Sequence, residues 1–270
     1  RYLIPRQQEN AGLKSEQLDL TDEGLRLAIQ RYTREAGVRE LERTIGRLAR
    51  KRAKDSLLNT PQTKPIDETS VADMLGPERF KSDKSRARLT NGVATGLAWT
   101  EAGGDVLYVE ASLTHKDEKV TITGHIGQVM QESVKAARSC IWTEAESLNI
   151  DRSKIEDSGV HVHVPAGAVP KDGPSAGITM AMALASAYSE KQVRDDIAMT
   201  GELTLSGLVL PVGGIREKVL AAHRSGIRHV ILPKENESEL EKLPEVIRDE
   251  MELSLVETLS DVVKLAIPEL

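Results

Sequence analysis

Hydrophobic side chains recur at helical spacing in residues 1–80. Three helices are expected: one capped by Thr21, one starting at about Val38, and a short one over about 68–75. The side chains predicted to face a core from the first two helices are Leu25, Ile29, Tyr32, Leu41, Ile45, Leu48 and Arg52. The third helix should end at Gly76-Pro77, because neither residue continues a helix well. Residues 1–80 are therefore predicted to form a small all-helical domain.

The pattern changes after a charged stretch, KSDKSRAR at residues 81–88, which has no hydrophobic period and is predicted to be a linker. Strands are expected at 105–112, 119–123, 160–164, 197–205, 229–232 and 253–257. A long amphipathic helix is expected at 126–148 and another from about Ile215. This mixture of strands and helices predicts an α+β domain over residues 89–270.

Composition and charge exclude few classes of function. The net charge of −6 gives no general basic surface for nucleic acid or membranes. A single cysteine, Cys140, excludes an intramolecular disulfide and fits a reducing compartment. The longest uncharged apolar run, 176–188, is shorter than the about 20 residues that a membrane span needs. We expect a cytoplasmic protein without a membrane partner and, because the chain opens on Arg1 rather than methionine, a part of something longer.

One serine stands out in the stretch PAGAVPKDGPSAGITMAMALASAY, residues 165–188. Pro174 fits the first position of a helix, which places Ser175 in its first turn. At that position, unpaired N–H groups and the positive end of the helix dipole would stabilise the oxyanion that forms when a nucleophile attacks a carbonyl. A serine in a first turn is more often only a local hydrogen-bonding residue, and the local pattern favours that interpretation. The phosphate-binding pattern GxxxxGK[ST] and the nucleophile pattern GxSxG both fail to match.

Histidines are one source of a base for such a serine. His161 and His163 alternate with valines on an expected strand, so both face one side of it. They could belong to a triad or, with a third ligand, to a metal site, although two solvent-facing histidines are the more ordinary interpretation. No HExxH pattern or cysteine pair supports a metal. His115 and His125 lie in or beside loops and remain open as bases.

Lys218 is the alternative base. On a helical wheel it lies about 60° from Ile215, at the border of the predicted apolar face. Burial there would lower its pKa, which must fall by roughly three units from about 10.4 for a base acting near neutral pH. From the wheel alone, a lysine that extends to water is the commoner outcome.

Several segments together resemble the Lon family of ATP-dependent proteases. PKDGPSAG at 170–177 matches the family's catalytic-serine motif, and MTGELTLSGLVLPVGGIREKVLAAHR at 199–224 matches the motif with its catalytic lysine. GLAWTEAGGD at 96–105 and GQVMQES at 127–133 are similar to further protease-domain segments. YTREAGVRELER at 32–43 is similar to the helical lid of a Lon AAA+ module. The resemblance covers nearly all of the chain and implies a lid followed by a Lon-type protease domain.

The resemblance also implies roles for individual residues. Ser175 would be the nucleophile and Lys218 the general base of a Ser–Lys dyad, without a metal. Thr200 matches a threonine that hydrogen-bonds the lysine. Asp172 matches an acidic neighbour that pairs with the lysine when the site is not productive, so activity is expected to need Asp172 turned away. Arg39 matches the sensor arginine that a lid offers to nucleotide phosphates.

The function implied is that of an ATP-dependent serine endopeptidase acting on unfolded, damaged or regulatory proteins, hexameric in its full-length form. These 270 residues contain no Walker A sequence. We therefore expect no ATP hydrolysis and at most ATP-independent peptidase activity, with no cofactor needed for it; the full-length enzyme would use ATP and Mg²⁺. The basic run at 47–54 suggests DNA binding only weakly. The alternative from another class is a ring-forming assembly module with a latent site.

Two places depart from the family pattern. Ala166 stands where many relatives have glutamate, in the loop before the serine motif. Ser206-Gly207-Leu208 stands where many have Arg-Gly-Arg or Arg-Gly-Gln. The first departure bears on loop contacts near the site and the second on charge contacts between subunits, and neither changes Ser175 or Lys218.

Overall fold

The computed structural model describes residues 2–33, 35, 37–58, 64–80, 89–100, 103–116, 120–165 and 171–270. The chain divides into two compact units, Arg1–Ser82 and Asp83–Leu270. The linker predicted at 81–88 and the departure at Ala166 lie outside the described residues.

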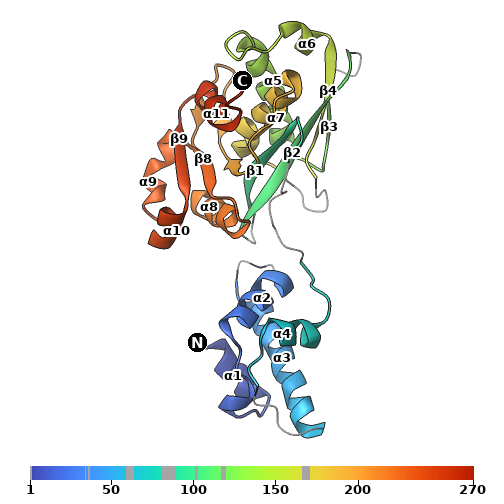
Figure 1. Ribbon diagram of the computed structural model, residues 1–270, viewed down its shortest axis with the longest axis vertical. Helices are drawn as coiled ribbons and strands as arrows, with labels where there is room; N and C mark the ends of the chain where they lie inside the picture. The colour runs from blue at the N-terminus through green and yellow to red at the C-terminus, as the bar shows by residue number, and fades with distance from the viewer. Residues whose placement is uncertain are drawn as a thin grey trace. The chain divides into compact units, whose positions relative to one another are not determined.

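Helices build the described part of the first unit (Figure 1). They are α1 Leu3–Asn10, α2 Asp22–Tyr32, α3 Arg39–Leu58 and α4 Glu68–Leu75. Thr21 caps α2 as predicted, because its Oγ1 accepts a hydrogen bond from Gly24 N at 3.0 Å. Hydrophobic spacing does not predict α1, whose sequence LIPRQQEN offers only Leu3 and Ile4 as large apolar side chains.

The core of the first unit lies between α2, α3 and α4. Ile45, Leu48 and Arg52 of α3 are buried as predicted. The prediction for Ile29 is wrong, since 42% of its surface is exposed. α2 instead turns the smaller Ala28 inward, where it is fully buried. The helical period therefore predicted the buried face of α2 to within one residue. Packing against the neighbouring helices determines which residue lies at the centre of that face.

A mixed sheet of seven strands forms the centre of the second unit, in the order β3-β4-β2-β1-β5-β8-β9. The strands are β1 Val93–Thr100, β2 Gly103–His115, β3 Val120–Thr123, β4 Ser158–His163, β5 Ile197–Met199, β8 His229–Pro233 and β9 Glu252–Val256. β2 runs antiparallel to β1 and β4, and the other neighbouring pairs are parallel. β1 is not predicted from alternation because it is buried on both faces over its first five residues.

Helices cover both faces of this sheet (Figure 1). Along β5, Ile197 and Met199 join one hydrophobic core and Ala198 joins another, as alternation along a strand requires. The first core includes residues of α5 Gln128–Thr143, α6 Arg152–Glu156, α7 Gly177–Ser189 and α11 Leu259–Ala266. The second includes residues of α8 Ile215–Arg224 and α10 Glu245–Glu250, and Leu240 of α9 Glu237–Leu240 packs against it. The sheet therefore separates α7, which follows Ser175, from α8, which contains Lys218.

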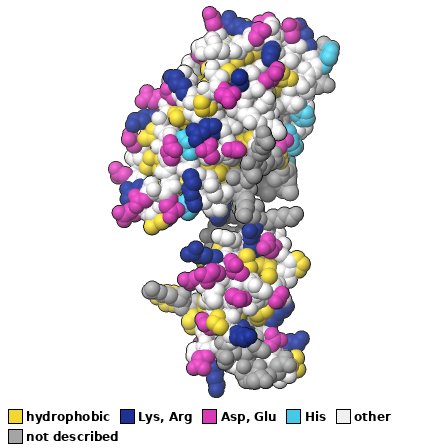
Figure 2. All heavy atoms as spheres, in the orientation of Figure 1, with side chains coloured by type: hydrophobic (Ala, Val, Ile, Leu, Met, Phe, Trp, Pro, Cys, Tyr) yellow, Lys and Arg dark blue, Asp and Glu magenta, His cyan; other side chains and the backbone are white. Residues whose placement is uncertain are grey.

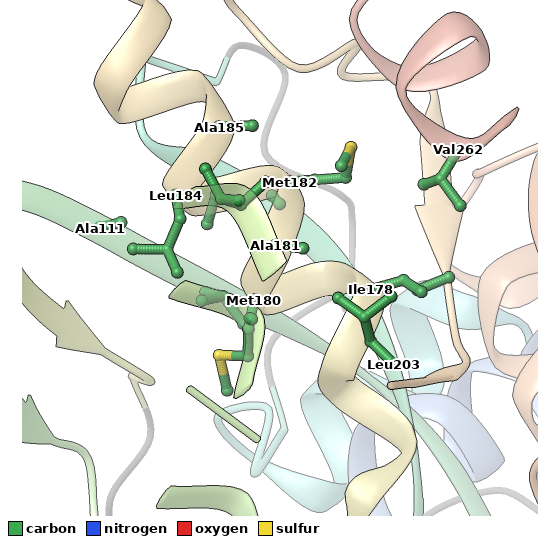
Figure 3. Packing of buried hydrophobic residues seen from close by; sticks show 14 of the residues in the cluster. Ala111, Ile178, Met180, Ala181, Met182, Leu184, Ala185, Leu203 and Val262 are labelled. Atoms are coloured by element: carbon green, nitrogen blue, oxygen red, sulfur yellow. The ribbon is translucent and has the colours of Figure 1, made fainter. Parts of the chain in front are cut away.

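α7 is buried from Gly177 to Tyr188. In Figure 3 Ile178 lies toward Leu203 and Val262, while Leu184 lies toward Ala111. The helix is thus held from several sides, and the loop that precedes it starts from a rigid support.

Two elements differ in extent from their predictions. The strand expected at 197–205 is divided into β5 and β6 Glu202–Leu203, which pairs with β7 Val209–Leu210. The division falls at Thr200 and Gly201, whose polar groups turn toward the loop before α7. The helix expected at 126–148 ends at Thr143, and turns carry the chain on to Asn149, which has a φ of 50°.

The surface carries both signs of charge. On the face shown in Figure 2, lysine and arginine side chains are interspersed with aspartate and glutamate, in line with the small net charge. None of the helices in the described part of the chain has the length and apolarity to cross a membrane.

Candidate active site

Ser175 lies in a 3-10 turn, Pro174–Ala176, that leads directly into α7. Pro174 occupies the first position of the turn as predicted, after Gly173, whose φ of 132° suits glycine alone. Two hydrogen bonds hold the Ser175 carbonyl oxygen: Gly201 N donates at 2.9 Å and Thr200 Oγ1 at 3.1 Å. The serine backbone is therefore fixed to the segment that follows β5.

The donors expected for an oxyanion are partly in use. Gly177 N donates to Pro174 O, and Ile178 N donates to Gly201 O at 3.1 Å. In this conformation the first turn of α7 therefore does not offer these two N–H groups to a ligand, contrary to the general expectation for a helix start.

Lys218 is fully enclosed, with 1% of its surface exposed. It lies in α8, which begins after Gly214, and Ile215, Val219 and Ala222 around it are buried as the wheel predicts. The expectation that the side chain extends to water is wrong, because the packing of α8 on the sheet covers the border of its apolar face. Burial lowers the pKa of Lys218 to about 8, and the negative charge of Glu239 limits the fall.

Thr200 connects the lysine to the serine. Lys218 Nζ donates a hydrogen bond of 3.0 Å to Thr200 Oγ1, and the same hydroxyl donates to the Ser175 carbonyl. Because the hydroxyl proton is directed to that carbonyl, its lone pairs face the lysine. Within the described residues, Ser175 Oγ and Lys218 Nζ make no direct hydrogen bond. One buried threonine thus links the Lys218 side chain to the backbone carbonyl of Ser175, 43 positions away in the sequence.

Asp172 points to another helix. Its Oδ1 accepts hydrogen bonds of 3.0 Å from Met130 N, in the first turn of α5, and from Gly173 N. A Cβ at Gly127, the residue before α5, would lie 2.3 Å from Asp172 Cγ, so only glycine admits the carboxylate here. Among the described residues, no ion pair joins Asp172 to Lys218. Asp172 therefore caps α5 in this conformation.

The two histidines of β4 contact a threonine on the neighbouring strand β3. His161 Nε2 and His163 Nδ1 on β4 contact Thr123 Oγ1 at 2.8 and 2.7 Å. Two strands, β2 and β1, separate β4 from β5. His115 and His125 are exposed. In the described ranges no three metal-binding side chains gather.

The remaining predicted residues are on the surface. Arg39 is the exposed first residue of α3, in the first unit. Ser206 lies between β6 and β7, where its Oγ is 3.1 Å from Thr204 Oγ1. Two residues that no motif singled out, Asn236 and Glu239, border Lys218's helix. The buried amide of Asn236 could not be recognised from spacing, because its backbone partner lies 24 residues away.

Two protein-family models match this chain. A family model described as the Lon protease (S16) C-terminal proteolytic domain matches residues 65–269. The chain belongs to the Lon protease family. A second model, for the Lon protease AAA+ ATPase lid domain, matches residues 9–66. α4 falls within the first match, although Val71 and Leu75 pack in the core of the helical unit.

Individual Lon proteases align along the whole chain. The Lon protease of Nitrosococcus oceani is 59% identical over 100% of this chain and 35% of its own length. The Lon protease of Dictyoglomus thermophilum is 49% identical over 99% of this chain, and Lon protease 1 of Myxococcus xanthus 47% over 99%. The chain spans about a third of the length of these relatives. It is an α+β Lon fragment with a helical lid and a protease domain.

Proposed function

We propose that this chain carries the peptidase site of an ATP-dependent serine endopeptidase, with Ser175 as nucleophile and Lys218 as general base. The observation that carries the proposal is the enclosed Lys218, whose pKa of about 8 leaves a usable fraction of neutral amine near pH 7. Its contact with Thr200, and that of Thr200 with Ser175, supports a role for the threonine in holding the pair together. Membership of the Lon family supports the same reaction class.

The chemistry proceeds by acyl transfer. Neutral Lys218 takes the Ser175 hydroxyl proton while Oγ bonds to the carbonyl carbon of the peptide. The protonated lysine gives that proton to the leaving amine nitrogen as the C–N bond breaks, which leaves an acyl ester on Ser175. Water then attacks the ester while Lys218 accepts its proton, and the protonated lysine returns that proton to Ser175 Oγ as the ester C–O bond breaks, which releases the acid product and restores both side chains. Ser175 Oγ and Lys218 Nζ must come within hydrogen-bonding distance for the first step.

The larger assembly is part of the same proposal. A homo-hexamer would deliver unfolded, damaged or regulatory proteins to Ser175 in the cytoplasm, driven by ATP and Mg²⁺ bound outside these residues. Arg39 would face the nucleotide phosphates there. Peptide hydrolysis itself needs no cofactor in this reaction scheme, since base, nucleophile and proton carrier are side chains of this chain.

Alanine variants test the dyad. Hydrolysis of a fluorogenic peptide without ATP should be lost in Ser175→Ala and in Lys218→Ala and retained in His125→Ala, His161→Ala and His163→Ala. An inactive histidine variant together with an active Lys218→Ala would replace this mechanism by a histidine-based one. Sedimentation as a ring, with neither turnover nor labelling of Ser175 by a serine-reactive inhibitor, would favour the assembly module instead.

We propose that Asp172 inhibits the site in a conformation in which its carboxylate no longer caps α5. If it can pair with Lys218, Asp172→Ala should change the rate or the pH profile of peptide hydrolysis, because a carboxylate beside the lysine would hold it protonated. Asp172→Asn is the matched variant, since it keeps an oxygen for Met130 N but carries no charge. An unchanged rate and profile in both variants would leave Asp172 with its capping role alone.

A further inference from the structure

A buried amide beside the site fixes the segment that leads into α8. Asn236, with 4% of its surface exposed, ends a 3-10 turn, Lys234–Asn236. Its Oδ1 accepts from Val212 N and its Nδ2 donates to Val212 O, both at 3.0 Å. One side chain thus satisfies both backbone groups of Val212, as a neighbouring strand would.

A short stretch of chain connects Val212 to Lys218. Val212 is followed by Gly213 and Gly214 and then by α8. Lys218 N donates to Gly214 O at 3.0 Å, which closes the first turn of the helix. Val212 also belongs to the same hydrophobic core as Ile215 and Val219. Asn236 therefore fixes the position of the start of α8 and, with it, the position of Lys218.

The same amide holds a carboxylate. Asn236 Nδ2 donates a second hydrogen bond, of 2.6 Å, to Glu239 Oε1 on α9, and this bond is partly buried. Glu239 is the charged group whose field acts on Lys218, and it opposes the effect of burial on the lysine pKa. A half-buried carboxylate held in one orientation exerts a stronger field than one that moves freely in water.

The other charged groups on the elements around α8 are directed elsewhere. β1 has no titratable side chain, and the charge of Asp105 on β2 acts on Lys171. On α9, Glu237 forms an ion pair of 2.8 Å with Lys234. On α8 itself, Arg216, Glu217 and Arg224 are not among the buried residues, and His223 Nε2 contacts Glu250 Oε2 at 2.6 Å. Among the described residues, Glu239 remains the charge to which Lys218 responds.

We propose that Asn236 and Glu239 form a positioning pair for Lys218, in which the Asn236 amide fixes the start of α8 and holds the Glu239 carboxylate in one orientation. The inference rests on the proposed role of Lys218 as base. Neither residue is required to touch the substrate. Their effect is to set where the amine lies and at which pH it becomes neutral.

Glu239→Gln tests the electrostatic part. The glutamine can still accept from Asn236, so the fold is retained while the charge is lost. We expect the pKa of Lys218 to fall by about half a unit to one unit, and the acid limb of kcat/KM to move to lower pH by the same amount. Glu237→Gln, on the same short helix, is the matched control and should move neither quantity.

The pKa is measured by nuclear magnetic resonance, with 13Cε-labelled lysine in the full chain and Lys218 assigned through Lys218→Arg. This titration needs no turnover. If the unchanged chain cleaves no peptide, the proposed function fails, whereas the titration still decides the positioning pair. A Lys218 pKa that is the same in Glu239→Gln and Glu237→Gln overturns the inference.

Asn236→Ala tests the coupling. In that background Glu239→Gln should shift the Lys218 pKa by less than half of its shift in the unchanged chain, because the carboxylate is no longer held. Equal shifts in the two backgrounds would show that Asn236 does not orient Glu239. Thermal unfolding checks that Asn236→Ala folds, and the comparison of Glu239→Gln with Glu237→Gln stands without it.

Discussion

Among the described residues, each unit buries one long cationic side chain, and the two differ in head group and in hydrogen-bond partner. In the helical unit Arg52 has 6% of its surface exposed, and its Nη2 donates to Lys64 O at 3.0 Å. Burial lowers its pKa, and Asp55 opposes the change. In the protease unit Lys218 is more completely enclosed, with a hydroxyl as its hydrogen-bond partner.

The difference between the two lies in the chemistry of the head group. A guanidinium cannot lose its proton in a protein, so burial of Arg52 produces a permanently charged structural donor. An amine can lose its proton, so the same kind of burial, which lowers the pKa of Lys218 to about 8, would allow it to act as a base near neutral pH. Under the proposed function, similar positions on amphipathic helices would thus lead to a structural role in one unit and a chemical role in the other.

Lys218→Arg should have the largest effect, since it replaces the amine of Lys218 with a guanidinium, the head group of Arg52. A permanently protonated side chain cannot take the Ser175 proton, so we expect kcat/KM for a fluorogenic peptide to fall on the order of a thousandfold or more. The reciprocal Arg52→Lys should leave kcat/KM unchanged. Substantial activity in Lys218→Arg at any pH would remove the lysine from the role of base.

The next effect concerns stability. Between pH 8 and 10.5 the unfolded chain keeps the Lys218 proton and the folded chain does not, so this lysine makes the protein more stable as pH rises through that window. Lys218→Met removes the penalty of burying the amine, and at pH 7 it should raise the free energy of unfolding by up to about 3 kcal/mol. The gain should shrink toward pH 10.5.

Denaturant unfolding followed by tryptophan fluorescence suits this measurement, because both tryptophans, Trp99 and Trp142, lie in the protease unit. A gain that is equal at pH 7 and pH 10 would mean that packing of the methionine, and not loss of the buried amine, is responsible. Such a result would mean that the pKa of Lys218 is that of an ordinary lysine.

Sequence alone predicts the burial of Arg52 but not that of Lys218. The helical period correctly placed Arg52, Ile45 and Leu48 inside, and family motifs pointed to Ser175 and Lys218. The wheel could not predict the burial of Lys218, because a border position is covered or open according to the element packed on it. The cap of α5 by Asp172 likewise joins residues 42 positions apart, and no local pattern encodes it.

Thr200→Val tests why the lysine, unlike Arg52, has a hydroxyl for its partner. The change removes the acceptor for Lys218 Nζ and the donor to Ser175 O while keeping the shape of a fully buried side chain. We expect kcat/KM to fall about tenfold to a hundredfold, because losing such buried bonds costs about 1–3 kcal/mol. Thr200→Ser, which keeps the hydroxyl, should recover most of the activity, and equal activity in both variants would assign Thr200 to packing alone.

Arg52→Met should have the smallest effect and completes the comparison. It removes the bond to Lys64 O, but it also removes Arg52 Nε, which has no hydrogen-bond partner among the described residues. These contributions oppose each other, so the stability of the helical unit should change by about 1 kcal/mol or less. Because a guanidinium stays charged in both the folded and unfolded chain, the change should be the same at pH 7 and pH 10. Hydrogen exchange of α3 measures it, and a clear dependence on pH would show that Arg52, too, releases its proton when buried.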